Sequence, residues 1–162
     1  MIVTVTLNPS LDEWVYLPRL RLGELNRAER TVRYPGGKGI NVSRVVHELG
    51  GKTLAVALAG GPDGRILAEL LRQQRIPYRF IDVPGSTRNN YQLFSETTRT
   101  LTQINSPGPR VSRWRLTEVT RLLRQACERG GVPSEAGSPR ESREQSSRDD
   151  RRPIASALGI PR

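Results

Sequence analysis

The sequence predicts an α/β fold in which helices cover a parallel sheet. Short runs of β-branched and aliphatic residues, at Met1–Leu7, Thr53–Ala59 and Tyr78–Val83, have the composition of buried strands. Amphipathic helical segments lie between successive runs, and alternating strands and helices imply parallel pairing through right-handed crossovers. Clusters of glycine and proline mark the boundaries between these elements.

The first fifty residues are expected to hold a strand, exposed strands and a helix. Asn8-Pro9-Ser10 ends the opening strand and leaves Asp12 on the loop that follows. The segment 14–34 alternates in short pieces with charges between them, which indicates exposed strands of a lid or an edge sheet. After the turn at 35–39, helical spacing predicts an amphipathic helix. Its apolar stripe would be Val42, Val45, Val46 and Leu49.

The later segments predict a second helix, a hairpin and a third helix. Asp63 is placed to cap the second helix. The buried face of that helix would carry Ile66, Leu67, Leu70 and Leu71. The runs 90–94 and 100–105 favour a hairpin that could join the earlier exposed strands in one sheet. The third helix would end at Gly130-Gly131 and be lined by Leu116, Val119, Leu123 and Ala126.

Composition narrows the class of protein. The 162 residues carry a net charge of +10, almost all from arginine, since Lys38 and Lys52 are the only lysines. The arginines are scattered without aromatic residues between them, which weighs against a nucleic-acid partner. The remaining explanations of the positive charge are a codon bias toward arginine and a phosphorylated metabolite as the partner. The single cysteine and single histidine argue against a disulfide, a triad and a metal cluster. No apolar run approaches membrane-spanning length, and we expect a cytoplasmic protein without a membrane partner.

Gly36-Gly37-Lys38-Gly39, just before the first predicted helix, carries the strongest functional signal. Glycines there leave backbone N–H groups exposed at the positive end of the helix dipole, a natural place for an anion. Asn41 follows on the first helical turn, where its amide can donate and accept hydrogen bonds. The pattern therefore predicts a site for a polyhydroxylated, negatively charged small molecule.

Five motifs occur in a fixed order along the chain. They are Thr4–Asp12, Gly23–Arg27, the pattern Gly37, Gly39, Asn41, Ser43, Gly50 and Gly60, Thr87–Asn89, and Thr102–Asn105 with Pro107–Pro109. With these motifs the sequence resembles the ribokinase-like sugar kinases of the phosphofructokinase B family, in the branch of 1-phosphofructokinase and tagatose-6-phosphate kinase. The resemblance covers residues 1–128. It implies the amino-terminal part of a three-layer, Rossmann-type α/β sandwich, with a small β-sheet lid whose strands lie within 14–34 and 89–105.

The resemblance also implies a site for a phosphorylated ketohexose. Its residues would be Asp12, Arg27, Gly37, Lys38, Asn41 and Arg88. Asp12 and the Gly37 N–H would bind sugar hydroxyls, while Arg88 would pair with the phosphate of the substrate. Lys38 and Asn41 would contact hydroxyls or phosphate, and Arg27 would reach the phosphate from a neighbouring subunit in a lid-to-lid homodimer. Each role has a plainer alternative. Asp12 could be a solvated loop carboxylate, Gly37 a turn glycine, Asn41 a helix cap and Arg88 a surface arginine.

The catalytic motif of the family is absent from this sequence. In such kinases a Gly-Ala-Gly-Asp motif in the carboxyl-terminal half stabilises the transferred phosphoryl group and activates the sugar hydroxyl. The nearest string, Glu135–Ser138, lies in the Ser-, Pro-, Gly- and Arg-rich segment 129–162, which we expect to be disordered. ATP and Mg²⁺ are implied cofactors, but the half that binds them is missing, so no catalytic residue is assigned. A reading-frame change or premature end near residue 129 would explain the switch in composition.

Three hypotheses follow for the function. The first is a kinase lineage, with ATP-dependent phosphorylation of a ketohexose phosphate, fructose 1-phosphate favoured, and a truncated chain that does not itself catalyse the reaction. The second is a non-catalytic module that binds a sugar phosphate. The third is nonspecific binding of nucleic acid by the basic tail, which ranks last because the tail also carries acidic residues.

Overall fold

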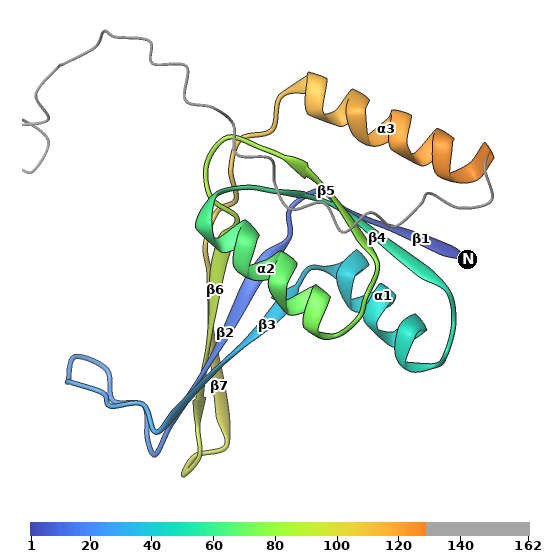
Figure 1. Ribbon diagram of the computed structural model, residues 1–162. Helices are drawn as coiled ribbons and strands as arrows, with labels where there is room; N and C mark the ends of the chain where they lie inside the picture. The colour runs from blue at the N-terminus through green and yellow to red at the C-terminus, as the bar shows by residue number, and fades with distance from the viewer. Residues whose placement is uncertain (129–162) are drawn as a thin grey trace, which may run out of the picture.

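The computed structural model describes residues 1–128, which form two sheets and three helices (Figure 1). The parallel sheet has the strand order β1-β4-β5, with bounds Ile2–Thr6, Thr53–Ala59 and Tyr78–Asp82. The second sheet has the order β3-β2-β6-β7, with bounds Arg30–Gly36, Ser10–Leu17, Arg88–Ser95 and Thr100–Asn105. The helices are α1 Lys38–Glu48, α2 Gly61–Gln73 and α3 Arg113–Glu128. The expectations for Gly130-Gly131 and for the segment 129–162 lie outside the described residues.

Helices cover both faces of the parallel sheet, which is the middle of three layers. One face of β4 carries small side chains, among them Ala57, which share a buried cluster with Leu67 and Leu71 of α2. The other face carries Leu58, which shares a cluster with Val119 of α3. Figure 1 shows α1 and α2 on one side of the sheet and α3 on the other. The predicted α/β architecture is confirmed, and every residue of β4 is buried, as the sequence indicates.

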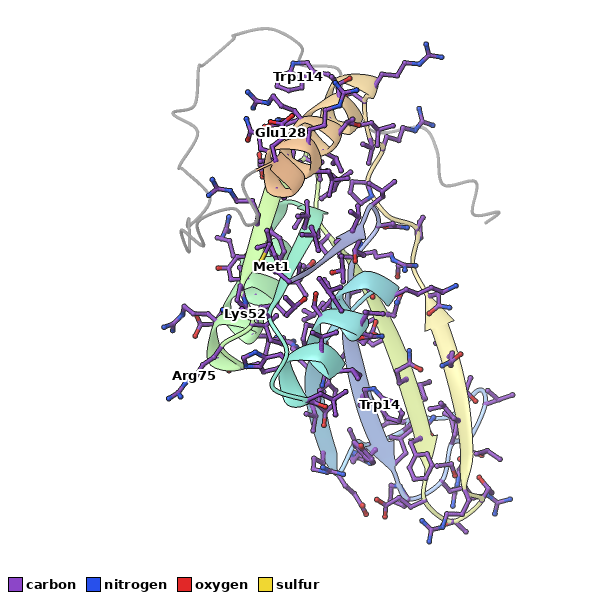
Figure 2. All side chains as sticks on the ribbon, turned by 90° about the vertical axis from the view of Figure 1, so that its right-hand side faces the viewer. Met1, Trp14, Lys52, Arg75, Trp114 and Glu128 are labelled. Atoms are coloured by element: carbon purple, nitrogen blue, oxygen red, sulfur yellow. The ribbon has the colours of Figure 1, made fainter. Side chains whose placement is uncertain are left out.

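The four-stranded sheet extends away from the parallel sheet as a lid (Figure 1). The predicted hairpin forms between β6 and β7, and it joins the earlier strands in one sheet because β6 pairs in parallel with β2. Aromatic rings pack on one face of the lid, where Tyr16 lies 6.2 Å from Trp14 (labelled in Figure 2) and 5.9 Å from Phe94. The Arg30 guanidinium covers the Tyr16 ring at 3.8 Å. These contacts stabilise a sheet that lies outside the main core.

Two strands differ from the prediction. The opening strand is not fully buried, because β1 is an edge strand whose Ile2 and Val5 side chains are exposed. Asp12 does not lie on a loop. It lies within β2, because it pairs on one side with Tyr34 of β3 and on the other with Asn90 of β6. The turn at residues 7–9 therefore leads directly from one strand into the next.

The apolar stripe predicted for α1 is not its buried face. Val42, Val45 and Leu49 are exposed and Val46 is half-buried, whereas Ile40 and Ser43 face the sheet and are fully buried. Ser43 is accommodated there because its hydroxyl is hydrogen-bonded at 2.7 Å to Thr4 Oγ1 and at 2.8 Å to Thr53 Oγ1. A polar residue with buried partners thus replaces the apolar face that the spacing predicts.

The other two helices follow their predicted faces more closely. Leu67 and Leu71 of α2 and Val119 and Ala126 of α3 are buried. Ile66, Leu70 and Leu123 are half-buried, and Leu116 is exposed.

Asp63 does not cap α2. The helix begins at Gly61, which places Asp63 inside the first turn, where its Oδ2 accepts a 2.9 Å hydrogen bond from Ser86 Oγ. The N-cap residue is Gly60, whose N–H donates to Thr87 Oγ1 at 3.1 Å.

Candidate functional site

The candidate site lies where the lid meets the carboxyl ends of the parallel strands. β1 ends at Thr6 and leads into β2, while β3 ends at Gly36 and leads into α1. The register places Ser10 of β2 between Gly36 of β3 and Arg88 of β6. Residues from three lid strands and the N-terminus of one helix therefore meet at the edge where α/β sheets commonly bind ligands.

The carboxylate of Asp12 is held in place by two side-chain donors. Its Oδ1 accepts hydrogen bonds from Ser10 Oγ at 2.8 Å and from Asn90 Nδ2 at 2.9 Å. Asn90 is 6% exposed, and its own Oδ1 accepts a 3.3 Å bond from Ser106 N. Oδ2 of Asp12 lies against Gly36, where an added Cβ would collide with it. The carboxylate is therefore preorganised to accept hydrogen bonds from ligand hydroxyl groups.

Sequence reasoning missed the residues that surround Asp12. Ser10, Gly36 and Asn90 all contact its carboxylate, yet none is among the predicted site residues. The Asn89-Asn90 pair is the signal that could have found Asn90, because asparagine is depleted in strands and two in succession call for a polar explanation. Gly36 belongs to the glycine run 36–39 that the sequence singles out for an anion, but a run of glycines already suits the turn and gives no sign that Gly36 contacts Asp12.

Gly37 sets the start of α1 against the end of β1. It is the N-cap residue with φ of +119°, a conformation that L side chains rarely adopt. A Cβ on it would meet Thr6 Cγ2 at 2.6 Å. Thr6 also anchors the helix, because its Oγ1 accepts a 3.1 Å hydrogen bond from Ile40 N. Only glycine therefore allows this close approach of the turn to β1.

The first turn of α1 presents Lys38 and Asn41 to solvent. Both side chains are exposed, and the turn holds no acidic residue that would offset the helix dipole. Asn41 is not the helix cap, because Gly37 occupies that position and Asn41 N donates to the Gly37 carbonyl at 2.9 Å. The side chain of Asn41 is thus available to a ligand.

Arg88 brings a guanidinium to the same end of the lid. It is the first residue of β6 and the register partner of Ser10, and its Nη2 donates to the Asn8 carbonyl at 3.4 Å. Its Nε is buried and has no hydrogen-bond partner among the described residues. A planar guanidinium with an unsatisfied donor suits a phosphate or carboxylate group.

Arg27 is not brought to the other predicted residues. It is exposed in the segment between β2 and β3, which lies at the end of β2 opposite to Ser10 and Asp12. Within one copy of the chain, the length of the lid separates Arg27 from the site. The remaining five predicted residues lie around the junction of lid and sheet.

The junction brings together groups that can bind hydroxyl groups and groups that favour negative charge. One oriented carboxylate and an exposed amide can bind hydroxyl groups, while a lysine, an arginine and a helix N-terminus favour negative charge. Within residues 1–128 there is no group of three His, Cys, Asp or Glu side chains that could hold a metal ion. None of the described helices has the length and apolarity needed to cross a membrane.

The fold is that of a family of carbohydrate kinases. Residues 5–135 match the sequence pattern of the pfkB family carbohydrate kinases, and the chain belongs to this family. It is 41% identical to 1-phosphofructokinase of Bacillus subtilis strain 168 over 112 residues, which are 69% of this chain and 36% of the relative.

Two solved structures share the fold. A possible 1-phosphofructokinase from Thermotoga maritima aligns with a TM-score of 0.74 and 36% identity, over 80% of this chain and 42% of that one. Phosphofructokinase-2 from Escherichia coli, solved in complex with fructose-6-phosphate, aligns with a TM-score of 0.73 and 30% identity, over 76% and 41%. These comparisons confirm the family resemblance.

The chain spans less than half the length of each of these relatives. The family match nevertheless includes all six predicted site residues, from Asp12 to Arg88. Their roles remain predictions.

Proposed function

We propose that residues 1–128 are the sugar-phosphate-binding portion of a kinase that phosphorylates a ketohexose phosphate, fructose 1-phosphate in particular, with ATP and Mg²⁺. The observation that carries the proposal is the convergence of the oriented Asp12 carboxylate, the Gly37 turn and the Arg88 guanidinium at one end of the lid. Membership of the pfkB carbohydrate kinase family supports the reaction class.

Each residue has a role that follows from its chemistry. Asp12 accepts hydrogen bonds from sugar hydroxyls, and the N–H of Gly37 donates to the sugar from the start of α1. Lys38 and Asn41 contact hydroxyls or phosphate. Arg88 binds the phosphate already on the substrate, because its fork of donors matches phosphate oxygens.

Arg27 acts only in a homodimer formed through the lid. It lies far from Asp12 in its own protomer, so its contact with a phosphate requires a neighbouring lid. The outer lid strand β7 supports such pairing, because all six of its residues are exposed and none is charged.

The residues present do not fit the nucleotide or the metal. The whole sequence lacks the Gly-Ala-Gly-Asp motif, and the described part offers no cluster of metal ligands. ATP and Mg²⁺ would supply the phosphoryl group and its charge neutralisation in a protein that holds both portions. For this chain alone we expect binding of the sugar phosphate without turnover of ATP.

That expectation makes a non-catalytic sugar-phosphate module the second candidate function. One observation favours this module: five predicted substrate residues lie around one junction, whereas the motif for phosphoryl transfer is absent from the sequence. The two candidates share the ligand and differ only in whether a complementary portion restores phosphoryl transfer.

Thermal unfolding and calorimetric titration of the full chain test the proposal. Fructose 1-phosphate at millimolar concentration should stabilise the protein, fructose and inorganic phosphate each less so. Arg88→Ala should remove the stabilisation. Arg124→Ala, which deletes the same charge from an exposed position on α3, should leave it unchanged. Absence of any shift with fructose 1-phosphate would overturn the proposal.

A further inference from the structure

Thr87 ties the start of β6 to the turn between β4 and α2. It is 2% exposed and directly precedes Arg88, the first residue of β6. Its N–H donates to the Gly60 carbonyl at 2.9 Å, while its Oγ1 accepts from Gly60 N at 3.1 Å and donates to the same carbonyl at 3.3 Å. Both backbone groups of Gly60 are therefore bonded to one residue that is 27 positions away in the sequence.

The segment 83–87 is also packed closely against that turn. A Cβ on Gly60 would collide with the carbonyl oxygens of Val83 and Gly85. A Cβ on Gly64, in the first turn of α2, would lie 3.2 Å from Thr87 Oγ1. Figure 1 shows the connection from β5 to β6 passing beside the start of α2. The start of β6 therefore has little room to shift relative to the parallel sheet.

The Arg88 side chain, in contrast, has few contacts that would hold it. Its Nη2 donates to the Asn8 carbonyl at 3.4 Å, which is longer than the usual N–H···O distance. Its buried Nε has no hydrogen-bond partner within residues 1–128. The position of the guanidinium therefore depends on where the backbone of Arg88 is fixed. That backbone is fixed by its pairing with Ser10 on β2 and by the bonds of Thr87 to Gly60.

We propose that Thr87 is a positioning residue for Arg88, and the inference rests on the proposed role of Arg88 in binding the phosphate of the substrate. Thr87 fixes the first residue of the lid strand to the β4–α2 turn, so that the guanidinium is held in place before the ligand arrives. Thr87 acts on the phosphate only through Arg88, because its own hydroxyl is buried and already bonded to Gly60.

A purely structural hydroxyl is the alternative role, and Ser43 provides the comparison. Its hydroxyl is also fully buried and also makes two hydrogen bonds, to Thr4 and Thr53. Those bonds lie between α1 and the parallel sheet, and neither partner adjoins Arg88. Loss of either hydroxyl should destabilise the fold, but only loss of the Thr87 hydroxyl should affect Arg88.

Calorimetric titration of the full chain with fructose 1-phosphate tests the inference. Thr87→Val keeps the branched shape and removes the hydroxyl, and it should lower the affinity about tenfold. Thr87→Ser restores a hydroxyl and should bind within about twofold of the wild type. Ser43→Ala is the matched control and should keep the wild-type affinity. Thr87→Ala replaces Thr87→Val if the valine variant fails to fold.

A double-mutant cycle shows whether the effect passes through Arg88. Arg88→Lys keeps the positive charge but loses the planar fork whose orientation matters for phosphate. In that background Thr87→Val should change the affinity by less than about twofold. A loss of about tenfold in both backgrounds would mean that Thr87 acts on the site without Arg88, and it would overturn the proposal.

Exchange of the Arg88 Nε–H with water gives a readout that needs no ligand. The signal is assigned by its absence in Arg88→Lys. Exchange should be about tenfold faster in Thr87→Val than in the wild type, and unchanged in Thr87→Ser and Ser43→Ala. Unchanged exchange in folded Thr87→Val would overturn the positioning role. If exchange responds as expected but the wild type binds no fructose 1-phosphate, the proposed function fails and the positioning of Arg88 by Thr87 stands.

Discussion

Asn90 Nδ2 donates a 2.9 Å hydrogen bond to Asp12 Oδ1, and the two residues are register partners on β6 and β2. The Asp12 carboxylate, which is the candidate group for binding ligand hydroxyls, is therefore oriented by the lid and not by the main core. The same strand pairing places Arg88 beside Ser10. The lid thus both borders the site and builds it, so a change in lid packing should alter ligand affinity.

Replacement of Asn90 by alanine should weaken both the fold and the site. The substitution removes one donor from Asp12 and leaves Ser106 N without its acceptor, which should lower the free energy of unfolding by about 1–3 kcal/mol. Affinity for fructose 1-phosphate should fall about tenfold, because the Asp12 carboxylate is no longer held. Urea unfolding and calorimetric titration measure the two effects.

Asn89→Ala is the matched control for that experiment. Asn89 precedes Asn90 on β6 but faces the other side of the lid, where its Nδ2 donates to Glu13 at 3.4 Å. Its replacement should leave the affinity for fructose 1-phosphate nearly unchanged. Equal loss of affinity in both variants would show that the lid acts only as a whole and that Asp12 has no special dependence on Asn90.

Gly37→Ala should destabilise the protein more than Gly50→Ala. Both glycines have positive φ, +119° at Gly37 and +76° at Gly50, so each alanine introduces backbone strain of about 1–3 kcal/mol, and the strain is larger at Gly37, whose φ of +119° with ψ of +138° is adopted almost only by glycine. Only at Gly37 does the new Cβ also meet a neighbour, Thr6 Cγ2 at 2.6 Å, whereas nothing lies within 4 Å at Gly50. The clash, together with the larger strain at Gly37, should cost about 1–3 kcal/mol, measured as the difference between the two variants in urea unfolding. Equal stabilities would contradict the close packing of the turn on β1.

Ser43→Ala should lower the free energy of unfolding by about 1–3 kcal/mol without affecting the ligand. The Ser43 hydroxyl is fully buried and links the hydroxyls of Thr4 and Thr53 at 2.7 and 2.8 Å. Its loss leaves those two groups without this partner beneath α1. The N-terminus of α1 remains held by Thr6, so titration with fructose 1-phosphate should give the wild-type affinity. A stability equal to that of the wild type would mean that water replaces the lost hydroxyl.

The sequence was sufficient for elements whose signal is local. β4 reads as a continuous apolar run and is buried throughout, and the turn between residues 95 and 100 predicts the hairpin of β6 and β7. The turn at Pro9 is a local signal and predicts a loop for Asp12. Its actual place in β2 depends on pairing with Asn90, which is 78 positions away. The hydrophobic periodicity of a segment carries no information on strand partners that are distant in the sequence.

The buried face of α1 shows a second limit. Val42, Val45 and Leu49 form a regular apolar row, yet the helix buries Ser43 because two threonine hydroxyls satisfy it. Hydrophobic spacing identifies a helix, but it cannot reveal a buried hydrogen-bond network supplied by distant strands. The family resemblance names Ser43, although its place in a motif does not distinguish a structural role from contact with a ligand.

Tyr78 should make the stability of the protein sensitive to alkaline pH. Its ring is 9% exposed and packs against Phe80 with ring centroids 4.8 Å apart. Burial raises the pKa of the Tyr78 hydroxyl above its ordinary value of 10.0, and the charge of Glu69 adds to the effect while Arg72 opposes it. The unfolded chain therefore releases this proton at lower pH than the folded protein. The resulting stability is fully present below about pH 10 and is lost as the pH rises through the folded-state pKa.

Urea unfolding between about pH 9 and about pH 11 should show a shallower loss of stability for Tyr78→Phe than for the wild type. Tyr91→Phe, at an exposed position on β6, should retain the wild-type slope, and identical slopes for all three proteins would contradict the assignment to Tyr78.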